Sequence, residues 1–159
     1  MNAASQAAAA DTGETRPVQV LSTAGRVGRL RYILYCVLMC LGLGLLSAVA
    51  AMFVLSSPIA SAVGLLLGWA AMLKLYVTLT VQRCHDFGSS GWLSILGLVP
   101  LVNLMFWFIP GTEGANRYGP PTPPNGIGVI AGTIAAALVA LFVIGLLVAG
   151  AGIPVYRPT

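Results

Sequence analysis

The chain has 159 residues, of which 58% are hydrophobic and only 8% are charged. A soluble domain carries roughly 25% charged residues, so this composition, with a mean hydropathy of +0.92, excludes an ordinary soluble globular protein. The net charge of +4 does not indicate nucleic-acid binding, because the basic residues form no stripe with exposed aromatic side chains. Half of them precede the first apolar run, which is a membrane-orientation signal.

The first part of the chain is predicted to be a disordered tail over residues 1–24. Residues 1–15 are polar and rich in alanine, and they lack the basic start and apolar core of a signal peptide. A membrane domain is expected over residues 25–124 and an additional transmembrane helix over residues 125–150. Residues 151–159 are expected to be a short tail.

Two apolar runs at residues 30–55 and 59–81 predict the first two transmembrane helices. The first run would extend roughly 39 Å as a helix, which exceeds a hydrocarbon core of about 30 Å. A short turn at Ser56, Ser57 and Pro58 separates the runs, so the two helices are expected to form an antiparallel hairpin.

The third apolar run, residues 92–109, leaves two alternatives open. It has 18 residues, near the minimum for a span, and it contains Pro100 and Asn103 near its middle. It either crosses with a kink or returns to the side that it left as a re-entrant hairpin, and crossing is favoured. With the fourth run at residues 127–149, the sequence predicts an all-α, polytopic transmembrane bundle of about four helices.

The arginines predict the orientation. If all four helices cross, one side holds six arginines and the other only Arg117, offset by Glu113. The positive-inside rule then places both termini in the cytoplasm, whereas a re-entrant third segment would place the C-terminus outside. The six are Arg16, Arg26, Arg29, Arg31, Arg83 and Arg157.

Small and aromatic residues suggest packing roles. Glycine pairs at 64 and 68 and at 128 and 132 have the small-xxx-small spacing that lets membrane helices approach closely, either within one bundle or in a dimer. The aromatic residues near the ends of the runs are expected to be interfacial anchors, and the three cysteines to be free thiols. They are Trp92, Tyr32, Tyr76, Trp107 and Tyr118, and Cys36, Cys40 and Cys84.

A polar stripe is predicted on the second helix. Lys74, Thr78, Gln82 and His85 fall within a sector of roughly 80° if the helix continues past residue 82. A charge inside a span costs about 3 kcal/mol on insertion scales, so Lys74 needs an explanation. The stripe either forms a proton or ion path, or Lys74 reaches the headgroups with its long side chain.

The short polar motifs do not indicate an enzyme. His85 beside Asp86 resembles an acid–base pair, but no nucleophile stands at a recognisable spacing, and one histidine with scattered cysteines cannot supply a closed zinc site. No phosphate-binding loop is present. Asp86 is expected to cap the next helix, or to pair with Arg83 or an N-terminal arginine. Neither a metal nor a cofactor is expected.

Three blocks of sequence resemble a bacterial inner-membrane family known as domain of unknown function 805. They read GRVGRLRY at residues 25–32, RCHDFGSSGW at 83–92 and GTEGANRYGP at 111–120. The resemblance extends from about residue 25 to residue 124 and implies an inner-membrane location without an assigned activity. Gln82, Cys84, Leu93 and Thr122 depart from the usual pattern. The motif residues singled out are Arg83, Asp86, Gly91, Trp92, Gly111, Gly114, Asn116, Arg117, Tyr118 and Gly119.

Two functions are consistent with these features. The first is a non-enzymatic membrane protein that acts by packing against a membrane-protein partner, a second copy of itself or lipid. In this case Arg26, Arg29 and Arg31 contact anionic headgroups, at about 1 kcal/mol for each basic residue. The alternative is a subunit of an oligomeric small transporter or channel, in which the polar stripe lines the path. A membrane enzyme that uses His85 and Asp86 is the least favoured interpretation.

Overall fold

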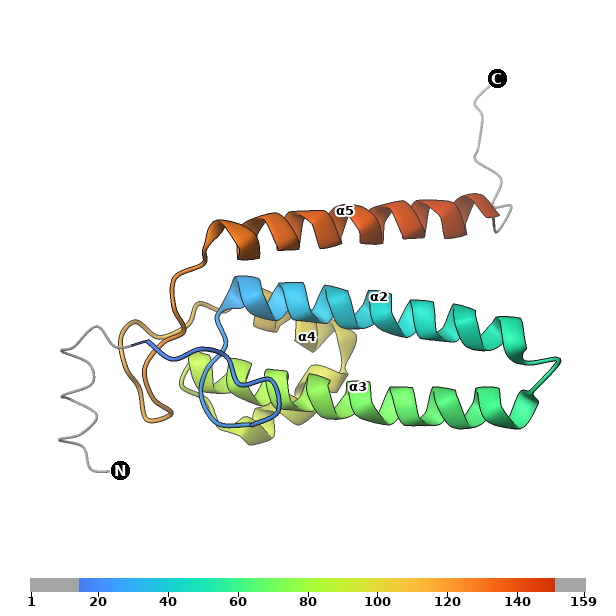
Figure 1. Cartoon of the computed structure of the whole chain (residues 1–159). Helices are drawn as coiled ribbons and strands as arrows, with labels where there is room; N and C mark the ends of the chain where they lie inside the picture. The colour runs from blue at the N-terminus through green and yellow to red at the C-terminus, as the bar shows by residue number, and fades with distance from the viewer. Residues whose placement is uncertain (1–14, 151–159) are drawn as a thin grey trace, which may run out of the picture.

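The computed structural model describes residues 15–150. This part of the chain forms helices α2 (Arg29–Phe53), α3 (Pro58–Asp86), α4 (Pro100–Phe108) and α5 (Ile127–Gly150), with a 3-10 helix η1 (Gly91–Leu98) between α3 and α4 (Figure 1). Residues 15–150 contain no strand, and a single isolated β-bridge joins Asn116 and Gly119. The all-α membrane fold expected from the sequence is confirmed.

Helices α2, α3 and α5 are each long and apolar enough to cross a membrane. Their 25, 29 and 24 residues correspond to roughly 38, 44 and 36 Å, against a hydrocarbon core of about 30 Å. In their most apolar windows only 11%, 11% and 6% of the residues are buried inside the protein. Most of their apolar side chains are therefore left for lipid to cover.

The third apolar run does not cross, which corrects the preference for four crossings. Helices η1 and α4 have 8 and 9 residues, or roughly 16 and 14 Å, and neither can span alone. The backbone carbonyls of Phe106 and Ile109 accept hydrogen bonds from Arg83, near the end of α3, and the amide of Thr112 donates to the carbonyl of Asp86 at 2.8 Å. The run therefore begins and ends at the same end of the bundle, as a re-entrant hairpin (Figure 1).

The hairpin turns at Val99 and Pro100. Proline lacks an amide hydrogen and disfavours a helical conformation in the preceding residue, and Val99 is extended, with φ −83° and ψ 118°. Backbone polar groups of an irregular segment inside a membrane need hydrogen-bond partners from the protein. The hydroxyl of Tyr76 is such a partner, because it donates to the carbonyl of Gly97.

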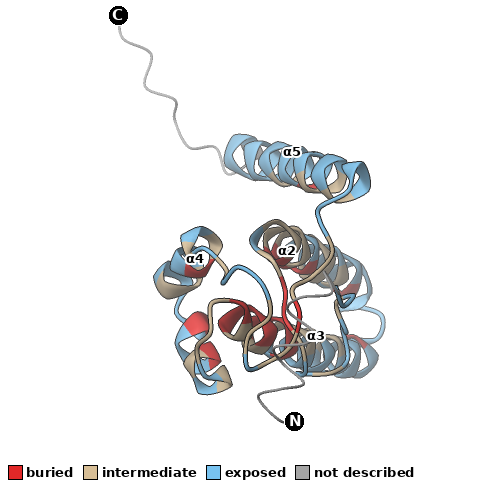
Figure 2. Ribbon diagram, turned by 90° about the vertical axis from the view of Figure 1, so that its left-hand side faces the viewer, coloured by how far each residue is buried: buried red, intermediate tan, exposed pale blue. Residues whose placement is uncertain are grey.

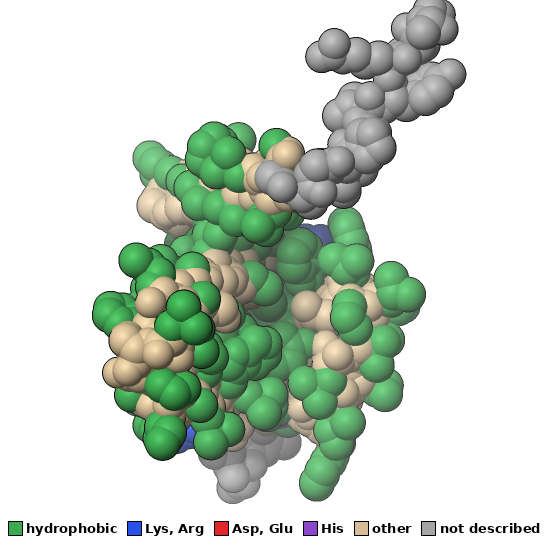
Figure 3. Space-filling model, turned by 90° about the vertical axis from the view of Figure 1, so that its right-hand side faces the viewer, with side chains coloured by type: hydrophobic (Ala, Val, Ile, Leu, Met, Phe, Trp, Pro, Cys, Tyr) green, Lys and Arg blue, Asp and Glu red, His purple; other side chains and the backbone are tan. Residues whose placement is uncertain are grey.

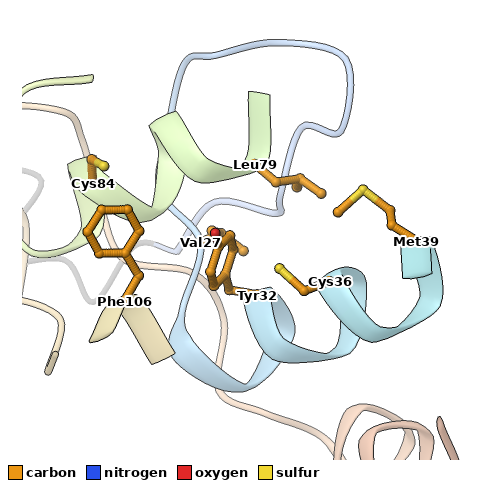
Figure 4. Packing of buried hydrophobic residues seen from close by; sticks show 7 residues of the cluster. All are labelled: Val27, Tyr32, Cys36, Met39, Leu79, Cys84 and Phe106. Atoms are coloured by element: carbon orange, nitrogen blue, oxygen red, sulfur yellow. The ribbon is translucent and has the colours of Figure 1, made fainter. Parts of the chain in front are cut away.

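The buried core lies between α2, α3 and the hairpin, near the end of α3. Figure 4 shows its apolar side chains converging from these three elements and from the segment before α2. Figure 2 shows that burial is concentrated there, whereas α5 is mainly exposed. The core residues are Val27, Tyr32, Cys36, Met39, Leu79, Cys84 and Phe106.

Helix α5 packs against α2. A Cβ added to Gly132 would lie 3.7 Å from Leu34 on α2, and one added to Gly68 on α3 would collide with Leu46 on α2. These two glycines therefore serve packing within one chain. Gly64 and Gly128 have no atom within 4 Å of an added Cβ, so a dimer through those positions stays a prediction.

The N-terminal segment is held against the bundle from residue 15 onward, although the sequence placed residues 1–24 in a disordered tail. The amide of Arg16 donates to the carbonyl of Pro121 at 3.0 Å, and the side chain of Gln82 donates to the carbonyls of Gln19 and Ser22 at 2.6 and 2.5 Å. The expected tails over residues 1–14 and 151–159, with Arg157, lie outside the described residues.

Candidate functional site

A buried cluster of three charged side chains lies where α3 ends. Asp86 pairs with Arg26, from the segment before α2, at 3.0 Å, and with Arg83, one turn earlier on α3, at 2.5 Å. Arg26, Arg83 and Asp86 are 3%, 0% and 5% exposed. We call these residues the Asp86 cluster. One carboxylate thus joins the N-terminal segment to the end of α3.

The two guanidinium groups use their other N–H groups on backbone carbonyls. Arg83 donates to the carbonyls of Phe106, at 2.9 Å, and of Ile109, which end the re-entrant hairpin. Arg26 donates to the carbonyls of Thr112 and Gly114, both at 2.6 Å, in the loop that follows. The cluster therefore ties four separate parts of the chain together.

The Asp86 cluster is stable only if each of its buried charges is paired and hydrogen-bonded. Burying a charge is costly unless it is paired and fully hydrogen-bonded, and here two arginines share a single carboxylate. The excess positive charge is met by the oriented carbonyl dipoles of the hairpin and loop, through charge-assisted hydrogen bonds. Loss of Asp86 would leave two buried guanidinium groups without a counter-ion.

Two motif glycines lie where the backbone approaches these side chains closely. A Cβ added to Gly111 would collide with the carboxylate of Asp86, and one added to Gly91 would lie 3.0 Å from Val81 and 3.2 Å from Nε2 of His85. Gly88, with φ +75°, occupies the left-handed position that commonly ends a helix. Close packing and backbone conformation therefore explain why glycine stands at these three positions, and no bound ligand is needed to explain it.

His85 is engaged by both flanking loops. Its ring stacks on the ring of Tyr118, with centroids 3.7 Å apart and an interplanar angle of 8°, and its Nδ1 lies 3.2 Å from the carbonyl of Gly25. Arg117 lies over the other ring of the stack, 4.8 Å from the centroid of Tyr118, and donates to the carbonyl of Gly88 at 2.9 Å. Glu113 forms no ion pair with Arg117 among the ion pairs of residues 15–150.

Polar contacts anchor the loop after the hairpin. The hydroxyl of Thr112 donates to the carbonyl of Asp86 at 3.0 Å, and Nδ2 of Asn116 donates to the carbonyl of His85 at 2.8 Å. Asn116 and Gly119 exchange backbone hydrogen bonds at 3.1 and 2.9 Å. The three sequence blocks therefore meet at one end of the bundle, although they lie as far apart in the chain as residues 25 and 120.

This meeting of three blocks agrees with the comparison to known families. The family described as "Protein of unknown function (DUF805)" matches residues 20–120. The chain belongs to this family. Helix α5 lies beyond the matched region, as the resemblance in the sequence implied, and the three sequence blocks that carry this resemblance build the Asp86 cluster and its loops.

Two curated proteins are similar over part of the chain. The Inner membrane protein YhaI of Escherichia coli K12 and its counterpart in Escherichia coli O157:H7 are each 41% identical over 66 residues. This match covers 35% of the present chain and 56% of each relative, so the chain spans little more than half the length of these relatives. No solved structure matches the chain.

The four residues of the polar stripe on α3 occupy different environments. Lys74 is exposed and lies with Thr78 in a shallow surface hollow beside residues 21–23. Thr78 and Gln82 are buried, and Gln82 binds the N-terminal segment. His85, partly buried, belongs to the stack with Tyr118. The path hypothesis for these four residues stays a prediction, and in this geometry it requires a second chain.

The three arginines predicted to contact lipid headgroups occupy different environments. Arg26 is buried in the Asp86 cluster, and Arg31 donates to the carbonyls of Pro123 and Pro124 at 2.5 and 3.0 Å. Arg29, at the start of α2, is exposed. Of the three, Arg29 is therefore the one most available to a headgroup.

A second polar layer was not apparent from the sequence. The hydroxyl of Tyr32 donates to Oδ1 of Asn103 at 2.6 Å and lies 3.1 Å from Oγ1 of Thr80. Tyr32 is 0% exposed, whereas Trp92 is 79% exposed, so Tyr32 is a core residue rather than the interfacial anchor expected. Asn103 inside an apolar run was the one available signal, because a polar side chain in a membrane needs a partner.

Proposed function

We propose that this protein is a non-enzymatic, multi-pass component of the bacterial inner membrane that acts through contact with lipid and with membrane-protein partners. The observation that supports this role is the internal use of the motif side chains. Asp86 is paired with two arginines, and the donors of Arg26, Arg83 and Asn116 are used on backbone carbonyls. A reactive site needs groups free to meet a substrate.

The inner-membrane location is supported by the YhaI proteins, whose names state it, and by the three apolar helices. The N-terminus is proposed to be cytoplasmic. The N-terminal segment, the end of α3 and the loop after the hairpin share one end of the bundle (Figure 1), and this end holds six arginines. The positive-inside rule places such an end in the cytoplasm. The six are Arg16, Arg26, Arg29, Arg31, Arg83 and Arg117.

Anionic headgroups are the lipid contact proposed at this end. Arg29 and Arg117 are exposed there, and each basic residue near an anionic surface contributes about 1 kcal/mol. The test is native mass spectrometry of the full chain purified from vesicles containing equal phosphatidylglycerol and phosphatidylcholine. Wild type should retain phosphatidylglycerol preferentially, and Arg29→Gln with Arg117→Gln should remove the preference, whereas Lys74→Gln should not. Equal retention of both lipids by wild type would contradict the headgroup contact.

A second experiment tests the absence of catalysis. His85→Phe preserves an aromatic ring for the stack on Tyr118 but removes every titratable nitrogen. If the motifs are architectural, this variant should co-purify with the same proteins and lipids as wild type and have unchanged thermal stability within about 1 kcal/mol. A folded His85→Phe protein that loses a cellular activity of the wild type would contradict the non-enzymatic role.

The transporter alternative has one supporting observation, which is the exposed Lys74 above a buried Thr78 on a membrane-facing helix. A path through these residues requires at least two chains. Its test is ion or proton flux in proteoliposomes, where Lys74→Leu and His85→Ala should abolish a flux that wild type supports. Crosslinking that yields only monomers in membranes would eliminate this alternative.

A further inference from the structure

A cleft opens beside the tip of the re-entrant hairpin. The hairpin reaches only to the level of Tyr76, which binds Gly97 near the turn and lies ten residues, or about 15 Å, from the end of α3. Beyond this level the hairpin no longer covers α2 and α3, and α5 packs on α2. Figure 3, viewed from the α2–α3 turn, shows a hollow between these helices and the hairpin, with hydrophobic side chains around it.

The cleft has a volume of about 330 Å³ and lies beside the apolar helices α2, α3 and α5 that are long enough to cross a membrane. All four α-helices contribute to its walls, and none of the lining side chains carries a formal charge. The lining residues are Cys36, Val37, Met39, Cys40, Leu43, Trp69, Met72, Leu73, Tyr76, Asn103, Trp107 and Ala140. We call this space the membrane cleft.

The membrane cleft offers few free polar groups, and the indole N–H of the lining residue Trp107 is buried without a hydrogen-bond partner. The hydroxyl of Tyr76 donates to Gly97, and Oδ1 of Asn103 accepts from Tyr32. A hydrated ion or polar solute would lose its water without receiving comparable partners, which costs several kcal/mol for a charged group. The lining therefore selects an apolar occupant.

The dimensions favour a slender occupant. The lining positions run from residue 36 to 43 on α2 and from 69 to 76 on α3, or about 10 Å in each case. A helix with its side chains is roughly 10–12 Å across, which is wide for a cleft of about 330 Å³. An empty apolar space of this size forfeits dispersion contacts, and hydrocarbon chains are the solvent at this depth.

We propose that the membrane cleft binds one hydrocarbon chain of a membrane phospholipid, inserted from the leaflet opposite the Asp86 cluster. The hairpin fills the half of the bundle nearest that cluster, so the cleft is reached from the other half. This proposal deepens the lipid contact of the proposed function and rests on it. It differs in that the protein recognises the hydrocarbon chain of the lipid and not its headgroup.

The test uses tryptophan quenching by brominated lipid chains. Trp107 is only partly exposed and lines the cleft, so the full chain with Trp69→Phe and Trp92→Phe reports on it alone. In phosphatidylcholine vesicles with dibrominated chains, its emission should fall at least twofold relative to unbrominated vesicles. Cys40→Phe, which fills the cleft from α2, should remove most of this quenching, and Leu38→Phe should leave it unchanged, because Leu38 is an exposed neighbour outside the lining.

A second variant and a second measurement guard against misfolding. Ala140→Leu fills the cleft from α5, and native mass spectrometry counts retained lipids. Wild type and Leu38→Phe should keep one phospholipid per chain after mild delipidation, and both filling variants should keep none. Equal quenching in all variants, loss of lipid from every protein alike, or a lipid-free dimer in which a second copy occupies the cleft would each overturn the proposal.

The two lipid proposals can fail separately. Cleft binding should be the same in phosphatidylcholine and phosphatidylglycerol vesicles, and it should persist in the protein with Arg29→Gln and Arg117→Gln. Headgroup selectivity should persist in Cys40→Phe. If the protein prefers anionic lipid but retains no hydrocarbon chain in the cleft, the proposal for the cleft is overturned and the headgroup contact still stands.

Discussion

At the scale of single residues, the fold depends on the carboxylate of Asp86, because the chain has few other acidic residues that could replace it. Asp86 is one of only four acidic residues in the chain, and it is the one that neutralises two buried guanidinium groups. Arginine suits the opposite role, since its planar group reaches several carbonyls at once. The hydrogen bonds of Arg83 to Phe106 and Ile109 fix where the hairpin ends.

Replacement of Asp86 by asparagine should strongly destabilise the fold. The change leaves Arg26 and Arg83 buried without a counter-ion, and removal of one partner of a buried ion pair typically costs about 3–5 kcal/mol. Thermal unfolding of the purified protein in detergent measures the loss. Glu113→Gln is the matched control, because Glu113 is exposed and the same change of charge there should shift stability by less than about 0.5 kcal/mol.

Replacement of Gly111 by alanine should also destabilise the protein, through sterics. The new methyl group collides with the carboxylate of Asp86, and overpacking of this kind costs about 1–3 kcal/mol. Gly126→Ala is the control, because an added Cβ there meets no atom within 4 Å. If the two variants unfold at the same temperature, the close approach of Gly111 to Asp86 is not required.

At the scale of elements, the re-entrant hairpin shows what sequence patterns can and cannot resolve. Pro100 and Asn103 indicated an irregular third segment. Hydropathy, however, does not distinguish a segment that crosses the membrane from a re-entrant one. The choice depends on long-range contacts, chiefly Arg83 with Ile109 and Tyr76 with Gly97. Periodicity and composition contain no information on such pairings.

The interfacial assignment of Tyr32 failed for a related reason. A tyrosine near the end of an apolar run is typical of a membrane interface, and only the positions of Asn103 and Thr80 across the bundle make it a core residue. In contrast, the two long helices and their antiparallel turn followed from local sequence, and the pairing of Asp86 with an arginine was one of the alternatives that the sequence left open. Each of these features is fixed by length, by turn residues or by the rarity of charge in a membrane.

Replacement of Tyr76 by phenylalanine should loosen the hairpin tip. The carbonyl of Gly97 would lose its donor at a depth without water, and an unsatisfied buried group costs about 1–3 kcal/mol. Hydrogen exchange of residues 95–101 should accelerate relative to that of α2. Tyr35→Phe is the control, since none of the side-chain hydrogen bonds within residues 15–150 involves Tyr35, and unchanged exchange at the tip in Tyr76→Phe would show that other contacts hold it.

At the scale of the whole molecule, the three crossings place nearly all polar recognition on one side of the membrane. The Asp86 cluster, the N-terminal segment and the loop after the hairpin share that end, while the opposite end offers the neutral α2–α3 turn (Figure 1). Helix α5 begins at the polar end and packs on α2. The molecule is therefore asymmetric, with the buried Asp86 cluster at one end and the neutral α2–α3 turn at the other.

This asymmetry makes the topology testable in the full chain. A cysteine introduced at Glu113, in the loop after the hairpin, should be protected from a membrane-impermeant maleimide added to intact spheroplasts, whereas one at Ser56, in the α2–α3 turn, should be labelled. Both residues are exposed, so membrane sidedness decides the difference, and the native cysteines lie within helices α2 and α3 and provide the background. Four crossings would instead put residues 56 and 113 on the same side, because two spans would then separate them. Labelling of both positions would therefore refute the re-entrant hairpin, and labelling of Glu113 alone would reverse the orientation that the arginines predict.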